Sequence, residues 1–71
     1  MNDISPLRIR MEREEDGRWL AIVDELPGVM AYGNDPAEAR KKVQSVALVI
    51  LADMIDHGEE LPVSLNLFFA A

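Results

Sequence analysis

Few side chains in this 71-residue chain have the chemistry for catalysis. His57 is the only histidine, and it falls in the last turn of a predicted helix, where the helix dipole favours an imidazolium. Ser5 and Ser45 have no histidine at a spacing that would make a nucleophilic pair. Neither GxGxxG nor GxxxxGK occurs, so no glycine-rich phosphate loop is expected. The sequence therefore predicts no catalytic residues and a protein that is not an enzyme.

Carboxylates are the side chains here that could bind a metal ion. Glu14, Glu15 and Asp16 are adjacent in a predicted turn, where they form either a solvated charge run or a cation site. Asp53 and Asp56 lie three apart and share a face of the predicted helix, near the end where carboxylates oppose the dipole. That placement suits contact with a basic partner as well as simple exposure. Because the chain has no cysteine, we expect no thiolate metal site, and no metal or cofactor is predicted.

The composition limits the class of protein. Thirteen acidic residues against seven basic ones give a net charge of −6, which disfavours binding to DNA, RNA or an anionic membrane. The only basic cluster, Arg40-Lys41-Lys42, is too small to reverse this expectation. Residues 46–52 form the longest apolar run, far shorter than the roughly 18–20 residues that span a bilayer, and residues 1–10 resemble no signal peptide. We expect one cytoplasmic domain over residues 1–71.

Three strands are predicted in the first half of the chain. Residues 7–13 alternate apolar and charged side chains, which is typical of a half-buried strand. Residues 19–23 are apolar throughout, which predicts a central strand with both faces covered. Residues 29–32 resume the pattern after Pro27-Gly28. The three segments predict an antiparallel meander whose first turn uses Gly17.

A helix and a fourth strand are predicted to follow. Asp35 is the expected N-cap, Pro36 the first helical residue and Glu38 the partner in a capping box. An apolar stripe then runs to about His57, and Gly58 is the expected terminator. Residues 63–69 alternate again. The predicted order is β-β-β-α-β, an α+β fold with one helix packed on one face of the sheet.

This architecture leaves apolar side chains without cover. One helix covers one sheet face, yet the second predicted strand carries Leu20 and Ile22 on the other face. The helix is also apolar all round its middle, so that Leu48, Leu51 and Ile55 exceed what a monomer core needs. These five residues predict the interface of a homodimer or a higher homo-oligomer. The alternative is that loops or residues 67–71 fold back over them.

Four motifs, taken together with their spacing, are similar to those of a known family. They are Glu15-Asp16-Gly17-Arg18-Trp19-Leu20-Ala21, Leu26-Pro27-Gly28, Gly33-Asn34-Asp35-Pro36-Ala37-Glu38-Ala39 and Gly58-Glu59-Glu60-Leu61-Pro62. Together they resemble the HicB-type antitoxin family, in a single-domain form without the C-terminal DNA-binding domain. The resemblance implies a partial ribonuclease-H-like fold without nuclease activity. It also implies a small basic HicA-type partner, a toxin that cleaves messenger RNA, and the acidic composition suits such a partner.

The sequence hypothesis is thus a non-catalytic HicB-like antitoxin or an interaction module derived from one. Its candidate partner-binding residues are acidic residues in two loops, with one tryptophan as an aromatic anchor: Glu14, Glu15, Asp16, Trp19, Asp24 and Glu25. Trp19 also fits the core, and Asp24-Glu25 also fits a plain polar loop. One alternative is an orphan dimeric module, regulatory or small-molecule-binding, that has no toxin partner. A metal-dependent nuclease that uses Asp53 and Asp56 is the least favoured alternative.

Overall fold

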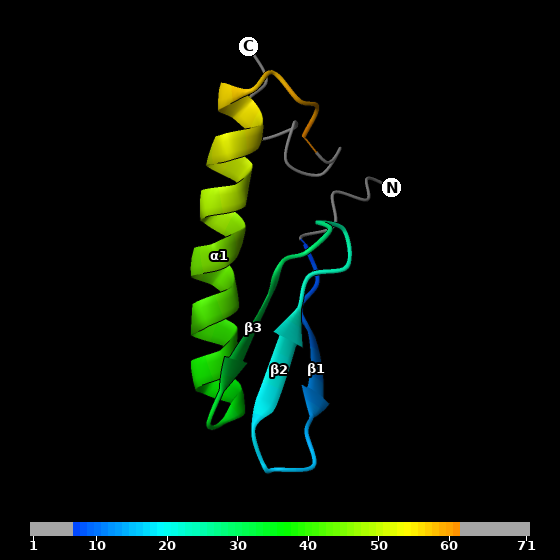
Figure 1. The fold of residues 1–71 in the computed structure, drawn as a ribbon, viewed down its shortest axis with the longest axis vertical. Coiled ribbons are helices and arrows are strands. Elements are labelled where there is room, and N and C mark those ends of the chain that lie inside the picture. Colours follow the sequence, from blue (N-terminus) through cyan, green and yellow to red (C-terminus); the bar gives the residue numbers. More distant parts are fainter. Residues whose placement is uncertain (1–6, 62–71) are drawn as a thin grey trace, which may run out of the picture.

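The α+β class and the predicted strand order are confirmed. The computed structural model describes residues 7–61. Within them lie β1 (Arg10–Arg13), β2 (Trp19–Ile22), β3 (Met30–Gly33) and α1 (Pro36–Asp56), in that order. The strands form an antiparallel sheet with the order β1-β2-β3, so β2 is central, as its doubly apolar pattern predicts (Figure 1). The predicted fourth strand, residues 63–69, lies outside the described residues.

The strands are shorter than the sequence pattern predicts. Only Arg10–Arg13 of the predicted strand over residues 7–13 pairs with a neighbour, because the paired part of β2 ends at Ile22. Leu7 and Ile9 precede β1 but keep the predicted alternation, since both are half-buried and pack against the core. The alternation therefore identifies the buried side of residues 7–13 correctly, but it overestimates the length of the paired strand.

The turn between β1 and β2 depends on a glycine with a positive φ. Gly17 has a φ of +91°, a conformation that a residue without Cβ adopts easily. Its amide donates to the Glu14 carbonyl at 3.0 Å, and the Glu14 amide donates to the Arg18 carbonyl at 2.8 Å. These bonds close the predicted hairpin.

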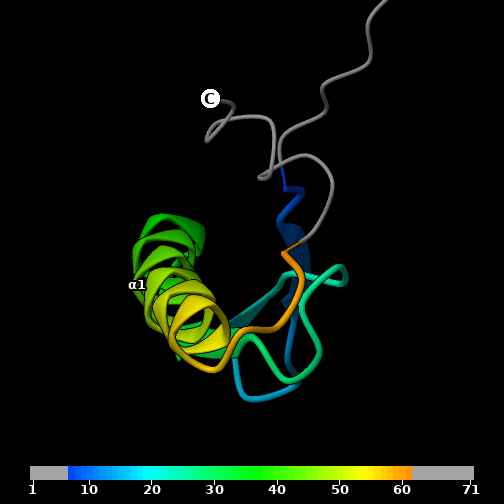
Figure 2. The same ribbon diagram turned by 90° about the horizontal axis from the view of Figure 1, so that it is seen from above.

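Helix α1 packs along one face of the sheet, and the core lies between them (Figure 2). The buried core residues come from β2, from the loop that follows it and from α1: Ala21, Val23, Leu26, Val29, Ala39, Val43 and Ala47. Leu26 and Val29 belong to the loop between β2 and β3, and each is only 1% exposed. The Val23 amide donates to the Val29 carbonyl at 3.0 Å, which brings the two ends of this loop together. The loop is thus part of the core rather than a polar connection.

The start of α1 is largely as predicted. The Asp35 side chain accepts a hydrogen bond from the Glu38 amide at 2.8 Å, and Pro36 is the first helical residue. In a standard capping box the Glu38 carboxylate would accept from the amide of the N-cap residue itself. It accepts instead from the Asn34 amide at 2.6 Å, one residue earlier. Both carboxylates therefore satisfy amides at the helix entry.

The end of α1 is a Schellman motif. Gly58 has a φ of +74°, its amide donates to the Ile55 carbonyl at 3.1 Å, and the Glu59 amide donates to the Met54 carbonyl at 2.9 Å. Gly58 is therefore the helix terminator, as predicted.

A third glycine fixes the contact between β3 and α1. A Cβ added to Gly33 would lie 2.3 Å from the Ala39 backbone nitrogen and 2.8 Å from the Ala39 Cα. Both atoms belong to the backbone, so they have little freedom to move aside. Only glycine allows this end of β3 to approach the first turn of the helix so closely.

Candidate functional site

The sheet face that points away from α1 is the main open surface of the described fold, and we call it the outer face. Side chains alternate along a strand, and Ala21 of β2 lies in the core, so its neighbours point outward. Pairing aligns Glu12 with Leu20 and Leu20 with Tyr32 in one row. A second row aligns the remaining outward residues of the three strands: Arg10, Ile22 and Met30.

The centre of the outer face is apolar, and it is open toward β3. Leu20 is 9% exposed between its neighbours, and Ile22 is half-buried. Met30 and Tyr32 are 49% and 42% exposed, although both are large side chains. Within residues 7–61 the helix covers only the opposite face (Figure 2). The outer face therefore presents an aromatic ring and a methionine to solvent.

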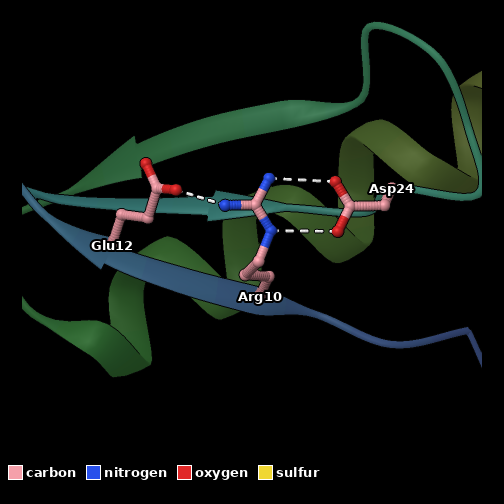
Figure 3. A network of polar contacts seen from close by, with 3 residues as sticks. All are labelled: Arg10, Glu12 and Asp24. Atoms are coloured by element: carbon pink, nitrogen blue, oxygen red, sulfur yellow. Dashed lines mark hydrogen bonds and ion pairs between the residues drawn. The ribbon is translucent and has the colours of Figure 1, made fainter.

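One edge of the outer face carries an ion-pair network (Figure 3). Arg10 of β1 donates from Nε and Nη2 to the two carboxylate oxygens of Asp24, each at 2.9 Å, and also pairs with Glu12. This two-point contact ties β1 to the loop that follows β2, fourteen residues along the chain. The hydrogen bonds and charge of Arg10 lower the pKa of Asp24, and those of Asp24 raise the pKa of Arg10.

A second arginine covers the exposed aromatic ring. The guanidinium carbon of Arg18, the residue before β2, lies 4.3 Å from the centroid of the Tyr32 ring of β3, which is a cation–π contact. Asp16 holds this arginine, since its carboxylate accepts from the Arg18 amide at 3.0 Å and from Nε at 2.7 Å. The backbone bond, followed by the side-chain bond, lowers the pKa of Asp16. The hairpin turn therefore positions a cation on the outer face.

The predicted partner-binding carboxylates do not form one cluster. Glu14, Glu15 and Asp16 lie in the turn after β1, whereas Asp24 and Glu25 lie in the loop at the other end of β2 (Figure 1). Asp16 and Asp24 are occupied by the arginines just described. Within residues 7–61 the other three, Glu14, Glu15 and Glu25, make no ion pair. A polar hollow at the turn is lined by Arg13 together with residues 14–16.

The aromatic residue on the outer face is Tyr32, not the predicted anchor Trp19. Trp19 is half-buried and packs against the core cluster, which matches the core role that the sequence also allowed. Sequence reasoning did not select Met30 and Tyr32. The alternation in residues 29–32 could have identified them, because Met30 and Tyr32 occupy the positions between and after the more buried Val29 and Ala31.

The residues expected at an oligomer interface lie on two separate surfaces. Leu20 and Ile22 are on the outer face. On α1, Leu48 and Ile55 are 68% and 52% exposed, whereas Leu51 is half-buried against the core cluster. The helix therefore offers an apolar surface of its own, apart from that of the sheet.

The single histidine of the chain lies at the C-terminal end of α1. His57 is the C-cap residue of α1, with Nδ1 2.9 Å from the Asp53 carbonyl oxygen and 3.3 Å from its carboxylate. Residues 7–61 contain no group of three histidine or carboxylate side chains placed to hold a metal ion. Within the same residues, α1 is not apolar enough over a sufficient length to span a bilayer.

Comparison with family models, with curated proteins and with solved structures finds no match.

Proposed function

We propose that this chain is a non-catalytic, HicB-like antitoxin-type module that binds a small basic protein of the HicA type through its outer face. The observation that supports this proposal best is that the outer face combines the exposed side chains of Met30 and Tyr32 with carboxylates at both ends of the sheet. The sequence resemblance set out above supplies the identity of the partner class. A cytoplasmic location and a partial ribonuclease-H-like relationship belong to the same proposal.

The apolar centre supports protein binding. Interfaces are enriched in aromatic residues and methionine at their centres, and a polar rim usually surrounds them. Ile22 of β2 together with Met30 and Tyr32 of β3 supplies such an apolar patch, and the Arg10–Asp24 pair supplies part of such a rim. Burying Tyr32 under a partner would remove water from both the ring and the Arg18 guanidinium above it, which strengthens their contact.

The charge arrangement supports a basic partner. Arg10 and Arg18 are each paired with carboxylates of the same chain, so these two present little net positive charge. Residues 8–25 carry six carboxylates against four arginines, and Glu14, Glu15 and Glu25 make no ion pair within residues 7–61, so this region stays acidic toward a partner. Complementary charge of this kind mainly accelerates association and selects the partner.

The proposal predicts that the adjacent open reading frame encodes a small basic protein, and titration of this protein with that product tests it. We expect a stable complex whose affinity falls as salt is added. Replacing Tyr32 with alanine should weaken binding about thirtyfold, since a central aromatic side chain commonly contributes about 2 kcal/mol to an interface.

A matched control uses the exposed surface of the helix. Val49→Ala also truncates an exposed apolar side chain, but it lies on α1 and not on the outer face. This variant should bind the basic protein as the parent chain does. Absence of any complex, or equal affinities of the parent and Tyr32→Ala proteins, would contradict the proposal.

A further inference from the structure

The backbone of β3 directs hydrogen-bonding groups away from the sheet. The Val23 amide donates to the Val29 carbonyl at 3.0 Å, so these two residues form a hydrogen-bonded pair that continues the register of β2 with β3. In an antiparallel sheet such pairs alternate with pairs that share no hydrogen bond. Met30 and Tyr32 occupy the positions without a shared bond. Each therefore points both its N–H and its C=O away from β2.

These four backbone groups have no hydrogen-bond partner within residues 7–61. A row of unpaired N–H and C=O groups on an edge strand is a template for another extended segment. The side chains of the same two residues, Met30 and Tyr32, are 49% and 42% exposed on the outer face. One ligand can therefore contact the backbone and the side chains of β3 together.

The two edges of the described sheet differ in how well they resist pairing (Figure 1). Three of the four residues of β1 are charged, namely Arg10, Glu12 and Arg13. Charged side chains on an edge strand disfavour pairing with another chain. β3 reads Met30-Ala31-Tyr32-Gly33 and has neither a charge nor a proline. The edge of β3 is thus the one suited to a further strand.

The loop that leads into β3 favours a basic occupant. The bond between Val23 and Val29 holds this loop at the start of the strand. The loop carries Glu25, which is exposed and makes no ion pair within residues 7–61. A lysine or arginine beside the start of β3 would meet this carboxylate.

From this geometry we infer that the basic partner adds an extended segment to the edge of β3, with backbone hydrogen bonds to Met30 and Tyr32. This inference rests on the proposed function and specifies how the partner binds. The side chains of an extended segment alternate between two faces, so every second one lies on the outer face. There they pair with the Met30 and Tyr32 side chains, which favours apolar residues at these positions. A basic residue of the segment lies toward Glu25.

Amide hydrogen exchange measured by NMR tests the pairing. In the free protein the Met30 and Tyr32 amides should exchange faster than the Ala31 amide, because Ala31 occupies a hydrogen-bonded position opposite Ala21. In the complex with the product of the adjacent open reading frame, both amides should exchange about tenfold more slowly or less, since a hydrogen-bonded amide exchanges only when it opens. The Arg13 amide at the edge of β1 is the control and should keep its rate.

Two substitutions at one position separate the backbone from the side chain. Met30→Ala and Met30→Pro both remove the methionine side chain, but only proline also removes the N–H. That N–H lies outside the ladder with β2, so its loss breaks no hydrogen bond of the sheet. Met30→Pro should bind the basic protein about fivefold more weakly than Met30→Ala, as expected for the loss of one hydrogen bond. Circular dichroism checks that both variants are folded, and if Met30→Pro is not, the exchange rates decide.

The outcomes distinguish this inference from the proposed function. A complex in which the Met30 and Tyr32 amides exchange as fast as in the free protein would overturn the strand pairing and leave the proposed function intact. Slow exchange of both amides in the free protein would also overturn it, because the edge would then be occupied by this chain or by a second copy. Absence of any complex would contradict the proposed function and this inference together.

Discussion

At the residue scale, Arg10 and Arg18 make the side-chain contacts that connect the parts of the outer face. Arg10 links β1 to the loop after β2 through Asp24, and Arg18 links the hairpin turn to the Tyr32 ring. Each cation is held by a carboxylate of the same chain. The two arginines therefore shape the outer face and leave its net charge to other side chains.

The Arg10–Asp24 pair should make part of the folding stability depend on pH. Because Arg10 lowers the pKa of Asp24 in the folded state, the pair stabilises the fold above the pKa of an unfolded aspartate, about 3.9. This stabilisation is lost as the pH falls through the lower, folded-state pKa. Asp24→Asn should therefore melt below the parent protein at pH 7, and the two melting curves should converge in strong acid.

Thermal melts followed by circular dichroism between pH 7 and pH 2 measure this convergence. Glu25→Asn changes the adjacent carboxylate, which has no ion pair within residues 7–61, and serves as the control. It should melt close to the parent at pH 7. If the melting temperature of Asp24→Asn differed from that of the parent by the same amount from pH 7 to pH 2, this pH dependence would be contradicted.

At the element scale, the end of β3 and the first turn of α1 approach each other closely at Gly33. Gly33→Ala would place a methyl group within 3 Å of backbone atoms of Ala39, so the strand and the helix would have to separate. We expect a loss of about 3 kcal/mol in the free energy of unfolding, measured by urea denaturation.

Gly17→Ala is the comparison for that junction. The added methyl group meets no atom within 4 Å, so only the positive φ opposes the change. The expected loss is about 1 kcal/mol. If Gly33→Ala were as stable as Gly17→Ala or more so, the close packing of β3 on α1 would not limit the fold.

The elements that local chemistry determines are the ones that the sequence predicts well. Asp35, Pro36 and Gly58 act within a single turn, so their types and spacing locate both ends of α1. The apolar run of β2 likewise predicts its central place. Strand length is harder to predict from the sequence, because β1 consists only of the four residues that pair with β2.

The candidate site depends on contacts between residues that are distant in the sequence, and it is therefore harder to predict. Asp24 was expected to face a partner, but the pairing register brings Arg10 to it across fourteen residues. Tyr32 gains its role from the strand order, which places it beside Leu20 and beneath Arg18. The sequence places Leu26 only in the turn motif Leu26-Pro27-Gly28, and the fold of the loop buries its side chain.

At the scale of the whole molecule, the described fold has a single core and two open surfaces. The core lies between α1 and the sheet, so the outer face and the exposed side of α1 lie in separate layers (Figure 2). The proposed function assigns a basic protein to the outer face. Such a contact suits a short chain, because it adds burial that a core of this size cannot supply.

The central claim is that the outer face binds a basic protein, and amide chemical shifts test it most directly. The ¹⁵N-labelled protein is titrated with the unlabelled product of the adjacent open reading frame. The account predicts that the largest shift changes fall on β2, β3 and the two loops that carry Glu14, Glu15 and Glu25, while α1 residues 41–56 change little. Changes concentrated on α1, or no changes at saturating concentrations, would contradict it.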